Sequence, residues 1–430
     1  MSEKQRLTQN MNSLFVLQGA NYIIPLIALP YLVRVLGPSK FGLIVFAQAF
    51  AQYFVILTDY GFNLTATRQI SIHRDEHLEV SEIFSAVMCI KLGLMLVSFL
   101  VVAAVVLISP GFRADWPVYF AAFLTVVGSV LFPIWFFQGL EKMKYITIVN
   151  VSTRFIATLS IFLLVHRPAD YFVATLVQSL GFLAAGTSGL FAARLVYPVR
   201  FHIPPIAAVR SALTEGWHVF VTSVAMNVLS NSGVFILGLF QSKEVVGAYA
   251  AAEKLVKAIA GVFAPATQAV FPLTSARFAT SHSAGRSVVL RTGKYLIPVA
   301  LLVSVLTALL ARPGIRLVYG PDYAKYSIVI VYLSIWMFFG VVNNMLGIQY
   351  LVGSGRSKAY SVSFLVASAV ALVLFFALVP RISFYGILYG MVVGAILLTI
   401  IMLWSVMKAE QSQAALARTS PTQYSEVSSK

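Results

Sequence analysis

The sequence predicts an all-α integral membrane protein. Of its 430 residues, 59% are hydrophobic and only 11% are charged, and the mean hydropathy is +0.86. These values lie outside the range of soluble globular proteins. The apolar runs are far longer than the ~10-residue alternating segments of an outer-membrane barrel, so we expect helical spans.

A helix needs ~20 apolar residues to cross a bilayer, and about twelve runs are long enough. The expected spans are about 14–36, 41–60, 82–108, 117–138, 145–165, 170–193, 214–240, 245–272, 294–311, 326–351, 358–379 and 384–407. The first two are joined by Gly37-Pro38, which is a strong helix breaker, and they should form a tight hairpin. In the second span, Gln48, Gln52 and Asp59 fall on one helical face, which predicts the wall of a cavity.

The spans divide into two groups of six. The longest interior break contains Pro198, Pro204 and Pro205, and we interpret it as a linker between two lobes. The expected domains are an N-lobe at 1–197, a cytoplasmic linker at 198–213, a C-lobe at 214–407 and a disordered cytoplasmic tail at 408–430.

The two halves show a weak internal repeat. The segment Gly37–Gly42 before Gln48 parallels Ser242–Gly247 before Glu253, at an offset of 205 residues. Equivalent elements enter the membrane in the same direction, as in transporters built from two parallel repeats that rock against each other.

The net charge of +16 is spread over many short loops. With both termini inside, eighteen basic residues fall in inner segments and nine in outer loops, so the positive-inside rule favours cytoplasmic termini. The same rule explains the charge better than nucleic-acid binding does. The single cysteine, Cys89, allows no intrachain disulfide.

Four basic side chains fall near mid-membrane: Lys91, Arg154, Lys254 and Lys257. Each costs ~2.5–3.5 kcal/mol at a helix centre, so these residues should face a protein interior or a watery cavity. Glu253 lies one helical turn from Lys257, and structural ion pairing explains part of the set. The cations still outnumber Glu253 and Asp59, which favours an anion-binding cavity. Asp59 alone fits the end of its helix equally well.

Other polar residues on single helical faces support the cavity, in addition to Gln48 and Gln52. They are Asn150, Asn227 and Asn231, and for these three interhelical hydrogen bonding is an equally good explanation. No zinc-protease motif, P-loop or nucleophile elbow is present, and the short loops leave no room for a catalytic domain. We therefore expect no enzymatic activity, no metal and no cofactor.

Several motifs resemble one bacterial family. The stretch from Asn21 to Gly42 and the run Thr58–Arg68 are similar to the N-terminal signature of Wzx-type O-antigen and polysaccharide flippases. The segments Gly247–Lys254, Phe271-Pro272 and Asn343–Gln349 resemble motifs of that family's C-lobe. The similarity covers nearly the whole chain except the tail.

The resemblance implies the multidrug/oligosaccharidyl-lipid/polysaccharide superfamily, with two six-helix lobes around a cationic cavity, as in MATE transporters. It implies movement of undecaprenyl-pyrophosphate-linked oligosaccharides across the bacterial inner membrane by alternating access. Lys91, Arg154, Lys254 and Lys257 would hold the headgroup, and Asp59 or Glu253 could couple movement to H⁺ or Na⁺. A polysaccharide polymerase and chain-length proteins are expected partners.

Two alternatives remain open at this stage. A drug antiporter of the same fold would be expected to place acidic residues in the cavity to hold a lipophilic cation. A non-transport component of polysaccharide assembly is compatible with the same sequence features.

Overall fold

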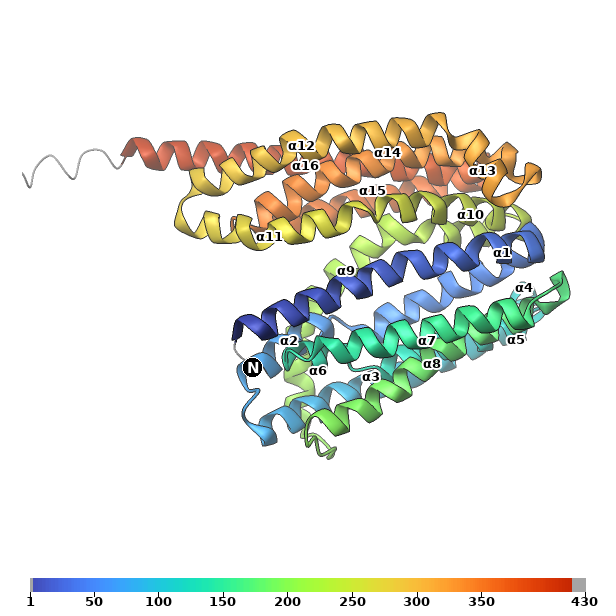
Figure 1. Cartoon of the computed structure of the whole chain (residues 1–430), viewed down its shortest axis with the longest axis horizontal. Coiled ribbons are helices and arrows are strands. Elements are labelled where there is room, and N and C mark those ends of the chain that lie inside the picture. Colours follow the sequence, from blue (N-terminus) through green and yellow to red (C-terminus); the bar gives the residue numbers. More distant parts are fainter. Residues whose placement is uncertain (1–2, 420–430) are drawn as a thin grey trace, which may run out of the picture. The chain divides into compact units, whose positions relative to one another are not determined.

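In the computed structural model, the backbone is described for residues 3–419 and the side chains for residues 27–413. Every element of this part is a helix (Figure 1). In the first half they are α1 (Glu3–Asp59), α2 (Phe62–Ile72), α3 (His77–Ile108), α4 (Pro110–Arg113), α5 (Trp116–Leu131), α6 (Ile134–Gly139), α7 (Met143–Leu164), η1 (Pro168–Asp170), α8 (Tyr171–Val196) and α9 (Ile206–Phe240). In the second half they are α10 (Lys243–Ala260), α11 (Phe263–Thr280), α12 (His282–Leu309), α13 (Ala311–Tyr319), η2 (Pro321–Tyr326), α14 (Ser327–Asn344), the π-helix η3 (Met345–Val352), α15 (Ser357–Ile382) and α16 (Phe384–Thr419).

The prediction of an all-α membrane fold is confirmed. Ten helices of the described part are long and apolar enough to span a membrane, and an eleventh span results if α10 and α11, bent by 41°, are counted together. The predicted span 245–272 is therefore two helices that meet at an angle. The predicted span 117–138 is likewise broken, because Pro133 separates α5 from α6.

The predicted first hairpin lies within α1. Its only non-helical residue is Gly37, with φ 69° and ψ 170°, a conformation that glycine adopts without steric cost. Figure 1 shows the chain reversing direction there, between the dark blue and the lighter blue helix.

The starts and ends of two helices, α9 and α16, differ from the sequence-based boundaries. Helix α9 starts at Ile206, within the predicted linker 198–213, directly after Pro205. The prediction of a disordered tail is wrong for residues 408–419, because α16 continues to Thr419. Residues 420–430 lie outside the described part of the chain.

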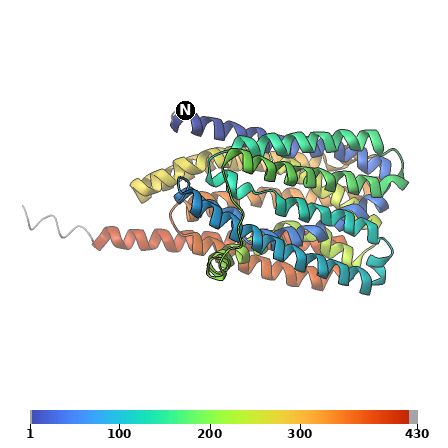
Figure 2. The same cartoon turned by 90° about the horizontal axis from the view of Figure 1, so that it is seen from below.

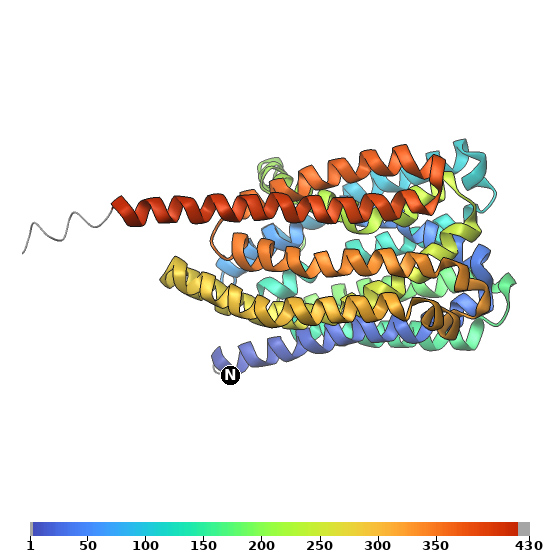
Figure 3. The same ribbon diagram turned by 90° about the horizontal axis from the view of Figure 1, so that it is seen from above.

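The helices form two compact units. The first unit consists of the described chain up to Asn227, together with Asn231–Ala251 and Leu317–Tyr323. The second consists of Val228–Ser230, Ala252–Arg316 and the chain from Ala324 onward. In the first unit, α7 and α8 lie side by side (Figure 2). In the second, α14 packs against both α12 and α16 (Figure 3).

An aromatic core fixes one end of the first unit. Trp135, Phe136 and Phe137 of α6 are fully buried and pack with Phe62 of α2 and Phe84 of α3. The broken span at Pro133 thus lets α6 direct three consecutive aromatic side chains into one cluster. This cluster holds α2 and α3 in place at the end of α1, where Asp59 lies.

A reciprocal backbone contact joins α1 and α10 within the first unit. A Cβ atom added to Gly42 would lie 2.8 Å from the Gly247 nitrogen and would overlap the Lys243 carbonyl oxygen. A Cβ atom on Gly247 would lie 2.8 Å from the Gly42 nitrogen and would overlap the Pro38 carbonyl oxygen. Gly247 follows Gly42 by 205 residues, and Lys243 follows Pro38 by 205 residues. This is the offset of the predicted repeat. This reciprocity is the geometry of a pseudo-two-fold axis.

Candidate functional site

The first predicted charged residue ends α1. Tyr60 and Gly61 have φ values of 46° and 85°, and this left-handed turn stops the helix directly after Asp59. A carboxylate at a helix C-terminus is unfavourable unless a cation or a donor compensates it. Both are present: Asn63 Nδ2 donates to Asp59 Oδ2 at 2.8 Å, and Lys91 Nζ lies 3.8 Å from Asp59 Oδ1.

Lys91, on α3, is 1% exposed, so its ammonium group has lost nearly all of its solvent. A buried cation of this kind needs a paired anion, and Asp59 provides it. This particular pair could not be predicted from residue spacing, because the two residues lie on different helices. Ion pairing therefore accounts for Lys91 without any ligand.

Arg154 has different surroundings. It lies in the middle of α7, is half-buried, and places its guanidinium carbon 5.8 Å from the ring centroid of Phe182 on α8. No carboxylate among the side chains described for residues 27–413 forms an ion pair with it. A cation–π contact of this kind leaves the planar donor groups available to a phosphate. Arg154 is thus better suited to an anionic ligand than Lys91 is.

The second group of charges lies on α10. Glu253 is 4% exposed, and Lys257 Nζ lies 3.2 Å from its Oε1. This confirms the pair that the spacing of one helical turn predicts. Lys254, beside Glu253, is half-buried. The first unit thus holds Asp59, Lys91 and Arg154, and the second holds the three residues of α10. A common cavity for all of them stays a prediction.

The uncharged Gln and Asn residues that were predicted to line a cavity differ in their surroundings. Gln48 Nε2 donates to Gln178 Oε1 at 3.1 Å and links α1 to α8. Asn150 donates to the Ile146 carbonyl of its own helix at 3.0 Å. Gln52 is exposed. Farther along the chain, Asn227 is half-buried and Asn231 is exposed. Their role in lining a cavity stays a prediction.

Two buried amides in the second unit were identified in the sequence only as parts of a motif. Gln349 of η3 donates to the Thr267 carbonyl at 2.9 Å and accepts from Thr274 at 3.1 Å. Asn343 accepts a hydrogen bond from Thr399 at 2.7 Å. These contacts show that the motif Asn343–Gln349 ties η3 to α11 and α14 to α16. The only signal in the sequence was the presence of amides within an apolar span.

Comparison with solved structures defines the class of fold. The chain superposes on a structure described as lipid II flippase MurJ in an inward closed conformation, with a TM-score of 0.72 and 12% identity over 93% of this chain and 87% of the other. An inward-facing MATE multidrug transporter gives a TM-score of 0.66 and 15% identity over 92% and 96% of the two chains. The fold is thus MATE-like, as predicted.

Residues 7–278 match the family described as "Polysaccharide biosynthesis protein", and the chain belongs to this family. An Escherichia coli (strain K12) protein named "Putative O-antigen transporter" is 30% identical over 407 residues, which cover 94% of this chain and 98% of the relative. A Shigella dysenteriae protein of the same name is 26% identical over 409 residues, or 94% and 100% of the two chains.

Proposed function

We propose that this protein is a flippase that moves undecaprenyl-pyrophosphate-linked oligosaccharides from the cytoplasmic to the periplasmic leaflet of the inner membrane. The observation that carries the proposal is the similarity to relatives named as O-antigen transporters over 94% of the chain. The MATE-like fold and the mid-membrane cations support it. The pyrophosphate is the part of such a substrate that a cationic cavity would hold.

The proposed mechanism is alternating access. The headgroup enters a cationic cavity from the inside, the lipid tail stays in the bilayer, and the cavity then opens outward. Arg154 is the first candidate for contact with the pyrophosphate. Its planar guanidinium group can donate two hydrogen bonds to one phosphate, and it has no ion-pair partner in the described part of the chain. Lys254 and Lys257 would provide further charge. Asp59 and Glu253 are the candidates for coupling to H⁺ or Na⁺.

Replacement of Arg154 by Gln should reduce flipping at least tenfold without lowering membrane abundance. The change removes a charge-assisted contact to phosphate but breaks no protein ion pair, and one such hydrogen bond contributes ~1.5–3 kcal/mol. Arg154→Lys should keep part of the activity. The assay is uptake of a fluorescent lipid-linked oligosaccharide into the inner leaflet of proteoliposomes, with complementation of a flippase-deficient strain beside it.

The matched control is Lys144→Gln, because Lys144 also lies on α7 and over an aromatic ring, 5.1 Å from the Tyr145 centroid. It should be neutral. Lys257→Gln must be measured together with Glu253→Gln, because the single change leaves a buried carboxylate without this partner. Full flipping by a well-expressed variant in which Arg154, Lys254 and Lys257 are all replaced by Gln would exclude recognition of the pyrophosphate by these residues.

The proposed orientation places both termini in the cytoplasm. A cysteine introduced at the exposed positions Ser39 or Pro321 should react with an impermeant maleimide from the periplasmic side. One at Lys142 or Ser357, both also exposed, should react only after permeabilisation. Cys89 is exposed and must first be replaced by Ser. Labelling of the Lys142 site in intact cells would contradict the orientation.

A further inference from the structure

A groove of about 790 Å³ opens within the second unit, between α12, η3 and α16. Its walls are mainly apolar and include Leu290, Ile297, Leu346, Leu403, Val406 and Met407. The volume is typical of ligand sites, and the lining is typical of sites for hydrocarbon. The proposed transport mechanism uses none of these residues.

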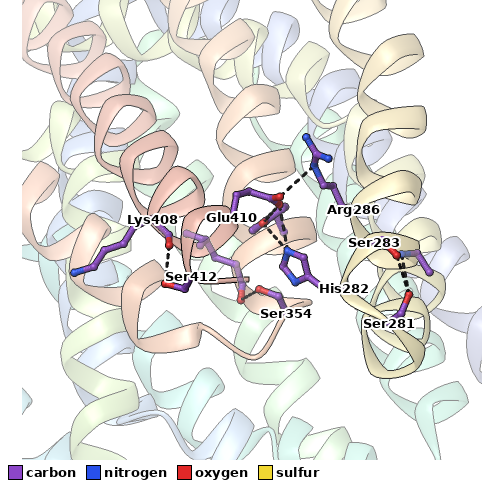
Figure 4. Close-up of polar contacts among 11 residues, drawn as sticks. Ser281, His282, Ser283, Arg286, Ser354, Lys408, Glu410 and Ser412 are labelled. Carbon is purple, nitrogen blue, oxygen red and sulfur yellow. Dashed lines mark hydrogen bonds and ion pairs between the residues drawn. The ribbon is translucent and has the colours of Figure 1, made fainter. Parts of the chain in front are cut away.

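Part of the groove is lined by members of a polar cluster around Glu410 of α16 (Figure 4). Its carboxylate accepts a hydrogen bond from the Tyr350 hydroxyl of η3 and lies 3.2 Å from Nε2 of His282. Arg286 Nε lies 3.4 Å from the other carboxylate oxygen. The cluster therefore connects α12, η3 and α16. Within it, the negative charge of Glu410 compensates the positive charge of Arg286.

Lys294 is the remaining cation of the groove. It lies on α12, eight residues after Arg286, and its side chain is exposed. It forms no ion pair with any carboxylate in the part of the chain whose side chains are described. The groove therefore combines an apolar surface with one uncompensated positive charge.

Two exposed amphipathic rings are chain neighbours of residues that line the groove. Tyr295, next to Lys294 on α12, is 66% exposed, and Trp404, next to Leu403 on α16, is 60% exposed. The ammonium group of Lys408 lies 5.4 Å from the Trp404 ring centroid. Exposed Trp and Tyr together with Lys are typical of the headgroup level of a membrane protein. This pattern favours a position of Lys294 at the headgroup level, with the apolar lining toward the hydrocarbon region.

We propose that this groove binds one anionic phospholipid of the surrounding membrane. Its phosphodiester would contact Lys294, and an acyl chain would lie along Leu290, Ile297 and Leu403. Basic pockets between membrane helices are known to hold acidic headgroups. One uncompensated cation matches the single charge of a phosphodiester, whereas a pyrophosphate carries more charge. The bound lipid would hold α12 against η3 and α16.

The test uses the full-length protein in detergent, titrated with phosphatidylglycerol or phosphatidylcholine. Bound lipid is counted by native mass spectrometry, and thermal unfolding is followed in parallel. We expect phosphatidylglycerol to bind and stabilise the protein, and phosphatidylcholine to do neither. Lys294→Gln should weaken phosphatidylglycerol binding roughly fivefold, the effect of one basic side chain near a membrane surface. Arg291→Gln, which changes an exposed cation of α12 outside the groove lining, should leave binding unchanged.

A second variant tests the shape of the groove without changing its charge. A Cβ atom on Gly293, which also lines the groove, would meet only Ile297 Cδ1 at 3.5 Å, so the backbone should tolerate Gly293→Leu. The longer side chain should fill the groove and abolish tight binding. Equal binding of phosphatidylcholine, or unchanged binding by both groove variants, would overturn the proposal. So would Lys294-dependent binding of undecaprenyl phosphate without binding of phosphatidylglycerol, which would assign the groove to the carrier lipid.

Discussion

Asp59→Asn alone should lower the free energy of unfolding by about 3–5 kcal/mol and reduce membrane abundance strongly. The change leaves the ammonium of Lys91 buried at 1% exposure without the carboxylate that lies 3.8 Å from it. Removing one partner of a buried ion pair is far more costly than removing both. The measurement is thermal unfolding of purified protein, together with membrane abundance by immunoblot.

The double variant Asp59→Asn with Lys91→Met separates structure from transport. It removes both charges, so it should recover most of the stability that the single change loses. If the pair is only structural, flipping recovers too. If Asp59 also couples flipping to an ion, the double variant is stable and inactive. A stability of Asp59→Asn equal to that of the unmodified protein would contradict the role assigned to this pair.

Gly42→Ala should lower the yield of folded protein severely. The new Cβ atom would overlap the Lys243 carbonyl oxygen and lie 2.8 Å from the Gly247 nitrogen, so α1 and α10 must separate. Overpacking typically costs about 1–3 kcal/mol, and a backbone neighbour that cannot rotate away places this change at the upper end. Thermal unfolding and elution as a monodisperse peak measure the effect.

Two other helical glycines provide matched controls. Gly93 of α3 and Gly340 of α14 have no atom within 4 Å of an added Cβ. Alanine at either position should be neutral or stabilise the protein by up to about 1 kcal/mol, because glycine is a poor helix former. Normal yield and stability of Gly42→Ala would show that the two helices do not meet through their backbones.

Much of the fold could be predicted because its signals are local. Apolar run length predicts membrane helices, Gly37-Pro38 predicts the reversal within α1, and the spacing of Glu253 and Lys257 predicts their ion pair. The bend between α10 and α11 and the break at Pro133 were not predicted. Hydropathy is insensitive to a change of helix direction within a continuous apolar run.

The candidate site was less predictable, because its contacts join residues distant in sequence. The sequence predicts that Lys91 lies away from bulk solvent, and it is buried, but its pairing with Asp59 depends on how α1 and α3 pack. Glu410 was assigned to a disordered tail, yet it accepts contacts from His282 and Tyr350. A polar segment at the end of a long helix carries no periodic signal that distinguishes a helix extension from a tail.

The reciprocal contact of Gly42 and Gly247 also makes the two positions depend on each other. Each glycine meets the backbone of the other, and each faces the carbonyl four residues before the other. A side chain added at either position would therefore push apart the same two backbone segments. Because the first such side chain already removes the close approach, a second one at the other glycine should cost less than it would alone.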